Sequence, residues 1–307
     1  MAKGDSQEDV QGEVRDTAFT EHFYSSQDGL RLHYRDYGPK DAETTPVICL
    51  PGLTRNCRDF HALAKRLSAE RRVICPDIRG RGKSARDPDW RNYHPSVYIN
   101  DVRHLLVALN MHRVFIVGTS MGGIMAMAMG AVMPTSVAGA LLNDIGPDID
   151  DDGLDDIVAF VHRADRVFAN WREAAEFLKS CFPHMPGMDD ETWLRAAKRT
   201  AVERPDGTIV NDWDPAIARP LESQRHSVDL WPMFRSLGRV PLVVVRGELS
   251  DILSAETLAR MQDAVPQMVP VIVPGFGHAP TLSEPQVPEP LNDALLAADR
   301  AKFSHNF

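Results

Sequence analysis

The chain has 307 residues and a net charge of −9, with 43% hydrophobic and 25% charged residues. This composition is typical of a globular protein and excludes a disordered one, and the length suits about two domains or one large core with an insertion. Because a nucleic-acid ligand calls for a basic protein face, the acidic excess argues against nucleic acid as a partner.

Three features predict the compartment. No stretch approaches the roughly 20 apolar residues of a membrane span, so we expect no membrane partner. The polar residues 1–16 lack the apolar region of a signal peptide. The four cysteines form no C-x-x-C pair and no zinc-binding pattern. We therefore expect a cytoplasmic protein with reduced cysteines.

The chain opens with a polar segment, residues 1–18, which we expect to be a flexible tail. Residues 19–25 and 30–37 then form two predicted strands around the turn at Asp28-Gly29, a hairpin signal. Short apolar runs, each typical of a strand buried on both faces, follow at 46–50, 72–75, 114–117, 139–142, 241–245 and 268–273. Helical patterns lie at 59–69, 96–109, 120–133 and 255–265. This alternation predicts a doubly wound, mostly parallel α/β sheet.

The alternation stops between residues 146 and 235. Apolar residues recur there at helical spacing, first from Ile157 to Trp171, and Asn170 with Glu173 resembles a capping box. The segment holds four of the five tryptophans and most of the chain's net negative charge. We predict a helical cap over 146–235, inserted into a core formed by 19–145 and 236–300.

One motif indicates chemistry. The predicted strand 114–117 leads into Gly118-x-Ser120-x-Gly122 and then into a helix rich in small residues. In a strand–turn–helix context, G-x-S-x-G is the nucleophile elbow, in which a strained turn exposes the serine hydroxyl at the helix N-terminus. We therefore predict that Ser120 is a nucleophile. The alternative is a glycine-rich turn with an incidental serine.

A nucleophilic serine needs a base, and the base needs an orienting carboxylate. In the order Ser…Asp…His, the histidine follows the last strand, where His278 lies in a glycine-rich loop. Asp251, after the strand 241–245, is our preferred acid, and Asp144, after the strand 139–142, is the alternative. Glu248 follows its strand too closely to reach the last loop easily.

Backbone amides should form the oxyanion hole. The residue after the nucleophile, Met121, supplies one amide. Leu53, in the loop after the strand 46–50, is the natural second donor.

Two other patterns are misleading. Residues 80–84 (G-R-G-K-S) end like a phosphate-binding loop, but the required earlier glycine is replaced by Asp77, so a hydrogen-bonded turn is expected. The acidic run 148–156 lacks the spacing of a calcium loop and is better explained as a solvated helix start. We predict no cofactor and no metal.

Taken together, these residues resemble the α/β-hydrolase fold family, in its serine esterase or lactonase-like branch, from about residue 20 to 300. The resemblance rests on Pro51-Gly52, on the motif from Asp77 to Ser84, on the elbow, on Asp251 and on Gly277-His278. It implies an eight-stranded sheet with a cap inserted after the sixth strand. Many relatives carry His-Gly in place of Pro51-Gly52.

The predicted activity is hydrolysis of a small-molecule carboxylic ester or lactone through an acyl-enzyme. The alternatives are a C–C bond hydrolase acting on a β-diketone-like product and a hydrolase-derived ligand-binding receptor. Aromatic residues of the cap suggest an apolar pocket roof, with Trp171, Trp213 and Trp231 as candidate substrate contacts. The acidic cap mildly disfavours anionic substrates.

Overall fold

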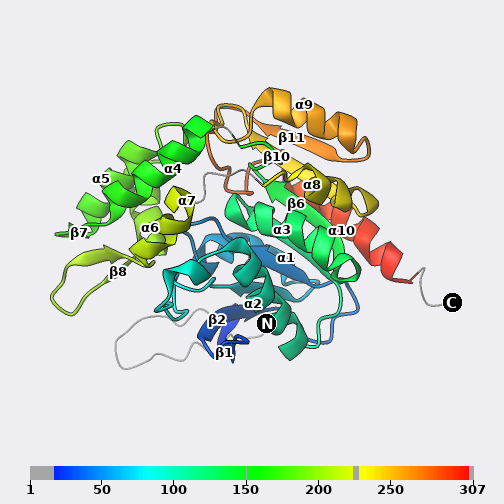
Figure 1. The fold of residues 1–307 in the computed structure, drawn as a ribbon, viewed down its shortest axis with the longest axis horizontal. Coiled ribbons are helices and arrows are strands. Elements are labelled where there is room, and N and C mark those ends of the chain that lie inside the picture. The colour runs from blue at the N-terminus through cyan, green and yellow to red at the C-terminus, as the bar shows by residue number, and fades with distance from the viewer. Residues whose placement is uncertain (1–16, 150, 224–227, 304–307) are drawn as a thin grey trace, which may run out of the picture.

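A computed structural model describes residues 17–149, 151–223 and 228–303 (Figure 1). Nearly all of the predicted tail, residues 1–16, therefore lies outside the described residues. None of the helices in the described part is long and apolar enough to cross a membrane.

The core is one eight-stranded sheet in the order β1-β2-β4-β3-β5-β6-β10-β11. Its strands are β1 (Phe19–Ser25), β2 (Arg31–Tyr37), β3 (Val47–Leu50), β4 (Val73–Pro76), β5 (Val114–Thr119), β6 (Val137–Asn143), β10 (Leu242–Gly247) and β11 (Val269–Val273). The hairpin β1–β2 is antiparallel and pairs antiparallel with β4, whereas β4, β3, β5, β6, β10 and β11 run parallel. The predicted fold is thereby confirmed. Because β5, β6, β10 and β11 are neighbours, the loops after their carboxyl ends meet at one edge of the sheet.

Helices cover both faces of this sheet. Because alternate residues of each strand point to opposite sides, each strand contributes to two separate apolar clusters. Ile116 of β5 joins a buried cluster with α2, α3 and α9, whereas its neighbours Phe115 and Val117 join a second cluster with α1 and α10. The helices of the core are α1 (His61–Leu67), α2 (Pro95–Ala108), α3 (Met121–Val132), α9 (Ala255–Ala264) and α10 (Pro288–Phe303). Each fully buried Val, Ile or Leu contributes roughly 1.5–3 kcal/mol of hydrophobic free energy, so burial on both faces explains the continuous apolar runs.

A long segment, here called the insertion (residues 144–241), separates β6 from β10. It contains α4 (Asp151–Ala164), α5 (Trp171–Cys181), α6 (Asp190–Thr200), α7 (Arg219–Ser223) and α8 (Trp231–Ser236), with β7 (Val167–Phe168), β8 (Ala201–Glu203) and β9 (Ile209–Asn211). Figure 1 shows α4, α5, α6 and β8 gathered at one end of the molecule. There Phe168, Trp193 and Ala197 belong to a small apolar core separate from those of the sheet.

The insertion differs from the expected helical cap in two ways. The strands β7, β9 and β8 form a small antiparallel sheet, whose β8–β9 turn contains Asp206-Gly207 with Gly207 at φ +84°. Asp-Gly is a strong hairpin signal, so the sequence did contain this information. In addition, Phe234 of α8 is fully buried in the same cluster as Met125 of α3. The helix α8 therefore packs on the core, although the predicted boundary at 235 assigned it to the cap.

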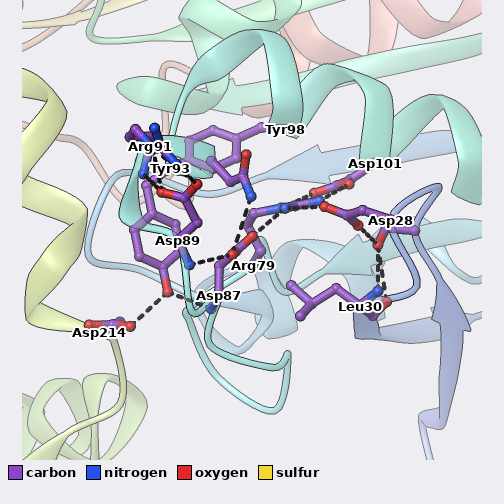
Figure 2. Close-up of polar contacts among 12 residues, drawn as sticks. Asp28, Leu30, Arg79, Asp87, Asp89, Arg91, Tyr93, Tyr98, Asp101 and Asp214 are labelled. Atoms are coloured by element: carbon purple, nitrogen blue, oxygen red, sulfur yellow. Dashed lines mark hydrogen bonds and ion pairs between the residues drawn. The ribbon is translucent and has the colours of Figure 1, made fainter.

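A buried arginine ties the hairpin to the core. The Arg79 side chain is fully buried and donates to Asp101 of α2 at 2.6 and 2.7 Å, to Asp87 at 2.6 Å and to Asp28 at 2.9 Å (Figure 2). Burial lowers the pKa of Arg79, but the bonds to Asp101 and Asp28 outweigh it and raise the pKa above the ordinary value. The bond from Arg79 lowers the pKa of Asp28 to about 2, whereas burial holds the pKa of Asp101 above its ordinary value.

We predict that Arg79→Met destabilises the fold by about 3–5 kcal/mol, because it leaves buried carboxylates without a counter-ion. The pKa of Asp101 is already higher in the folded protein than in an ordinary carboxyl group. Ionisation of Asp101 therefore lowers the free energy of unfolding as the pH rises above the pKa that Asp101 has in the unfolded chain. Removing Arg79 raises the folded-state pKa further and so enlarges this loss. Urea unfolding should show a larger loss at pH 8 than at pH 5. The exposed pair Arg91–Asp89 gives the control, since Arg91→Met should change stability little. An equal loss at both pH values would contradict this account.

Candidate active site

Ser120 occupies a sharp turn between β5 and α3. Its backbone has φ +51° and ψ −115°, and α3 begins at the next residue, Met121. Such a conformation costs a non-glycine residue on the order of 1–3 kcal/mol and persists only where its surroundings impose it. Here the Ser120 amide donates to the Asn143 carbonyl at 3.0 Å, and the Ser120 carbonyl accepts from Gly123 and Ile124.

Close packing explains the glycines of this turn. A Cβ on Gly118 would overlap the carbonyl of Gly122, and a Cβ on Gly122 would overlap the carbonyl of Leu50 in β3. The start of α3 can thus pack against β5 and β3 only because Gly118 and Gly122 lack side chains. This is the strand–turn–helix context that the G-x-S-x-G motif predicts.

His278 lies in the loop after β11 and contacts a buried carboxylate. Its Nδ1 is 2.8 Å from Oδ2 of Asp144, whose side chain is fully buried. A carboxylate only accepts hydrogen bonds, so Nδ1 carries a proton, and in the neutral imidazole the lone pair is therefore on Nε2. The loop is itself held in place, since the Gly277 amide donates to the His184 carbonyl of the insertion at 2.7 Å.

Asp144 is fixed by donors from β10 and from the turn that follows it. The Gly247 amide donates to its Oδ1 at 2.8 Å, and the Ser250 hydroxyl donates to its Oδ2 at 2.7 Å. The backbone of Asp144 has φ +58°, a left-handed conformation that aspartate tolerates better than most residues. Three donors therefore surround this buried carboxylate, which compensates for its loss of water.

The expected pairing of His278 with Asp251 is not what the structure shows. Asp251 is exposed, and the carboxylate at His278 is the alternative, Asp144. The reason is the turn after β10, where Ser250 points its hydroxyl at Asp144 and accepts from the amides of Ile252 and Leu253. The loop expected to supply the acid thus supplies donors to it. Glu248 is exposed and accepts from the Gly275 amide at 2.8 Å.

The two predicted oxyanion donors lie near the elbow. Met121 is the first residue of α3, where an amide has no intrahelical acceptor. Leu53 lines the same pocket as Ser120, and its carbonyl accepts from Nε of the buried Arg81 at 2.7 Å. That guanidinium also reaches Sδ of Met121 at 3.8 Å.

Ser120 and His278 line one pocket with a volume of about 220 Å³. Its wall is mostly apolar, and residues from both the core and the insertion contribute to it. The lining residues are Gly52, Leu53, Thr54, Arg55, Asp59, Phe60, Thr119, Ser120, Asn143, Ile157, Phe160, Leu178, Phe182, Met185, Met188, Trp193, Ala196, Arg199, His278, Ala279, Pro280, Thr281 and Leu282.

None of the three tryptophans predicted as substrate contacts lines this pocket. Trp213 is buried in the main core, while Trp171 and Trp231 donate through Nε1 to Glu203 and Asp148. The tryptophan that does line it is Trp193 of α6. Sequence reasoning missed it, although Trp193, Ala196 and Arg199 recur every three residues and so share one helix face.

One buried group of side chains has the residue types of a metal site. Ligand atoms of His33, Cys57 and Asp77 lie within 4.8 Å of one another. Both Asp77 oxygens are already engaged, by the Cys57 amide, the Lys83 amide and His33 Nδ1. Burial raises the pKa of Asp77, but these donors outweigh it and lower the pKa. The group is explained as the hub of the hydrogen-bonded turn 77–84.

Fold and site together define a hydrolase with a nucleophile elbow, and comparison with known proteins agrees. The chain matches the alpha/beta hydrolase family over residues 47–288 and belongs to that family. It is 33% identical to the 3-hydroxybutyrate-oligomer hydrolase of Cupriavidus necator, over 83% of this chain and 89% of that protein. It is 28% identical to the 2-(acetamidomethylene)succinate hydrolase of Mesorhizobium japonicum, over 78% of this chain and 84% of that protein.

Solved structures show the same fold. An α/β hydrolase from Novosphingobium aromaticivorans superposes with a TM-score of 0.86 at 41% identity, over 92% of this chain and all of that one. The crystal structure of E-2-(acetamidomethylene)succinate hydrolase gives a TM-score of 0.74 at 26% identity, over 92% and 98% of the two chains.

The backbone strain at Ser120 makes a testable prediction. Ser120→Gly should be more stable than Ser120→Ala by up to about 1 kcal/mol, because glycine adopts a positive φ without steric cost. Urea unfolding of the two variants measures the difference directly. As a control, Ser136→Gly and Ser136→Ala should show no such gain for glycine, since the residues with positive φ do not include Ser136. A less stable Ser120→Gly would mean that the turn is not strained.

Proposed function

We propose that this protein is a serine hydrolase that cleaves a carboxylic ester or lactone through an acyl-enzyme. One observation carries the proposal: Ser120 on its strained turn shares a pocket with His278, whose Nδ1 is bonded to buried Asp144. The ester substrate named for the Cupriavidus necator relative, a 3-hydroxybutyrate oligomer, supports the choice of bond.

In the proposed reaction, Nε2 of His278 takes the proton of Ser120 while Oγ attacks the ester carbonyl. The amides of Leu53 and Met121 stabilise the oxyanion that forms. Asp144 holds the imidazole in the required tautomer and stabilises its protonated form. His278 then protonates the departing alcohol and activates water, which attacks the acyl-enzyme and releases the acid.

We also propose that residues 146–235 act as a cap over this reaction. This proposal is supported by the pocket lining, in which Phe160, Phe182 and Trp193 of this segment occur together with Ser120. A pocket closed by apolar side chains limits the access of water and strengthens the interactions of the charged groups inside.

The first test is hydrolysis of p-nitrophenyl acetate and p-nitrophenyl octanoate by the wild type and Ser120→Ala. We expect wild-type turnover to fall by roughly three or more orders of magnitude in the variant, as for other triad nucleophiles. Labelling by a fluorophosphonate should likewise require Ser120. A wild type that is labelled but inert on both esters would show a working nucleophile with another substrate class, and lactones and C–C substrates would be assayed next. Absence of both labelling and turnover would contradict the proposal.

A second test separates the two candidate acids. Asp144→Asn should lower kcat by roughly 10³–10⁴-fold, because the amide cannot stabilise the protonated imidazole and favours the wrong tautomer. Asp251→Asn is the matched control and should stay within about twofold of the wild type, since the Asp251 side chain is exposed. Fluorophosphonate labelling rates of the folded variants provide a substrate-independent readout. The opposite ranking would restore Asp251 as the acid.

A further inference from the structure

Two partly exposed arginines contribute to the wall of the largely apolar pocket. Arg55 comes from the loop after β3 and Arg199 from α6 of the insertion, and both line the pocket together with Ser120 and His278. One carboxylate, Asp59, stands between the two guanidinium groups. The three side chains therefore carry a net charge of +1 in a mostly apolar wall.

The carboxylate is not shared equally. Arg55 holds Asp59 in a bidentate pair, with Nε–Oδ2 and Nη2–Oδ1 distances of 2.5 and 2.6 Å. Arg199 reaches the same carboxylate only at 3.6 Å, from its Nε. Since a bidentate pair already satisfies Asp59, the charge of Arg199 is poorly compensated within the described part of the chain.

The position of Arg199 is fixed from the core side. Its carbonyl accepts from Nδ2 of the buried Asn56 at 2.9 Å, so α6 is tied at this residue to the loop that carries Arg55. Burial lowers the pKa of Arg199, and the neighbouring Arg55 and Arg195 lower it further, against the effect of Asp59. An anion bound beside Arg199 would relieve this unfavourable environment.

We propose that Arg199, supported by Arg55, binds a carboxylate of the substrate, so that the enzyme acts on esters that also carry a free carboxylate. This inference names the substrate class of the site and rests on the proposed ester hydrolysis. Guanidinium groups suit the role because they bind carboxylates with two parallel hydrogen bonds and remain charged at all physiological pH values. The negative charge of the insertion as a whole disfavours anions, but the charge beside Ser120 has the opposite sign.

The test compares p-nitrophenyl hydrogen succinate, glutarate and adipate with their neutral methyl esters. The wild type should prefer the acid by about tenfold or more in kcat/KM for at least one chain length, and added salt should weaken the preference. Arg199→Met should abolish this preference, so that kcat/KM for each acid falls to the value for its methyl ester. Arg91→Met is the matched control and should keep it, since Arg91 is exposed, pairs with Asp89 and does not line the pocket.

Glutarate binding, measured by calorimetry on Ser120→Ala, gives a readout that does not depend on catalysis. Arg199→Met in this background should weaken binding about tenfold or more. Asp59→Asn should strengthen it, because it removes the competing carboxylate, and this opposite sign remains testable if Arg199→Met fails to fold.

The two assays separate failure of the subsite from failure of the reaction. Glutarate binding that needs Arg199, in a protein inert towards every ester, would retain the subsite and overturn the ester chemistry. Ester turnover without acid preference, combined with glutarate binding that is indifferent to Arg199 and Asp59, would overturn the subsite alone.

Discussion

The carboxylate of Asp144 is the constraint around which this site is built. A fully buried carboxylate is stable only when hydrogen bonds replace its lost water. Its donors come from β10, from the following turn and from the last loop, through Gly247, Ser250 and His278. Gly247 is itself required to be small, since a Cβ there would lie 2.5 Å from the carbonyl of Phe276. Satisfying Asp144 therefore draws the loops after three strands together and fixes the imidazole beside the pocket.

Arg81 is a second buried group that holds parts of the site together, here the two residues of the predicted oxyanion hole. The guanidinium of Arg81 binds the carbonyl of Leu53 and approaches Sδ of Met121, the two residues proposed to stabilise the oxyanion. The Arg81 backbone also bridges to Trp213 of the insertion. Its neighbour Arg79 links the same turn to Asp28 and Asp101. The turn 77–84, whose end resembles a phosphate-binding loop, thus acts as a structural hub, which explains its concentration of glycine, arginine and aspartate without any nucleotide.

The sequence predicted what depends on local pattern. Strands buried on both faces appear as apolar runs, and an elbow needs small residues at fixed positions around Ser120, so the sheet and the motif were predictable. The partner of His278 was not, because Asp144 and Asp251 both follow strands that end at the same sheet edge. Only the turn after β10 decides between them, by directing Ser250 rather than Asp251 inward. The pocket wall depends on how α6 rests on the core, which no single-segment pattern reveals.

The net charge of the protein and the charge at the pocket have opposite signs. The net charge of −9, and the acidic excess of the insertion, describe a field that salt screens within about 10 Å. A substrate in the pocket meets the few groups that line it, and there Arg55 and Arg199 outnumber Asp59. The apolar wall around them offers few other charged groups, so a bound anion would interact mainly with these three. Specificity for an anion is thus compatible with an acidic protein, provided that the compensating carboxylate is already occupied, as Asp59 is by Arg55.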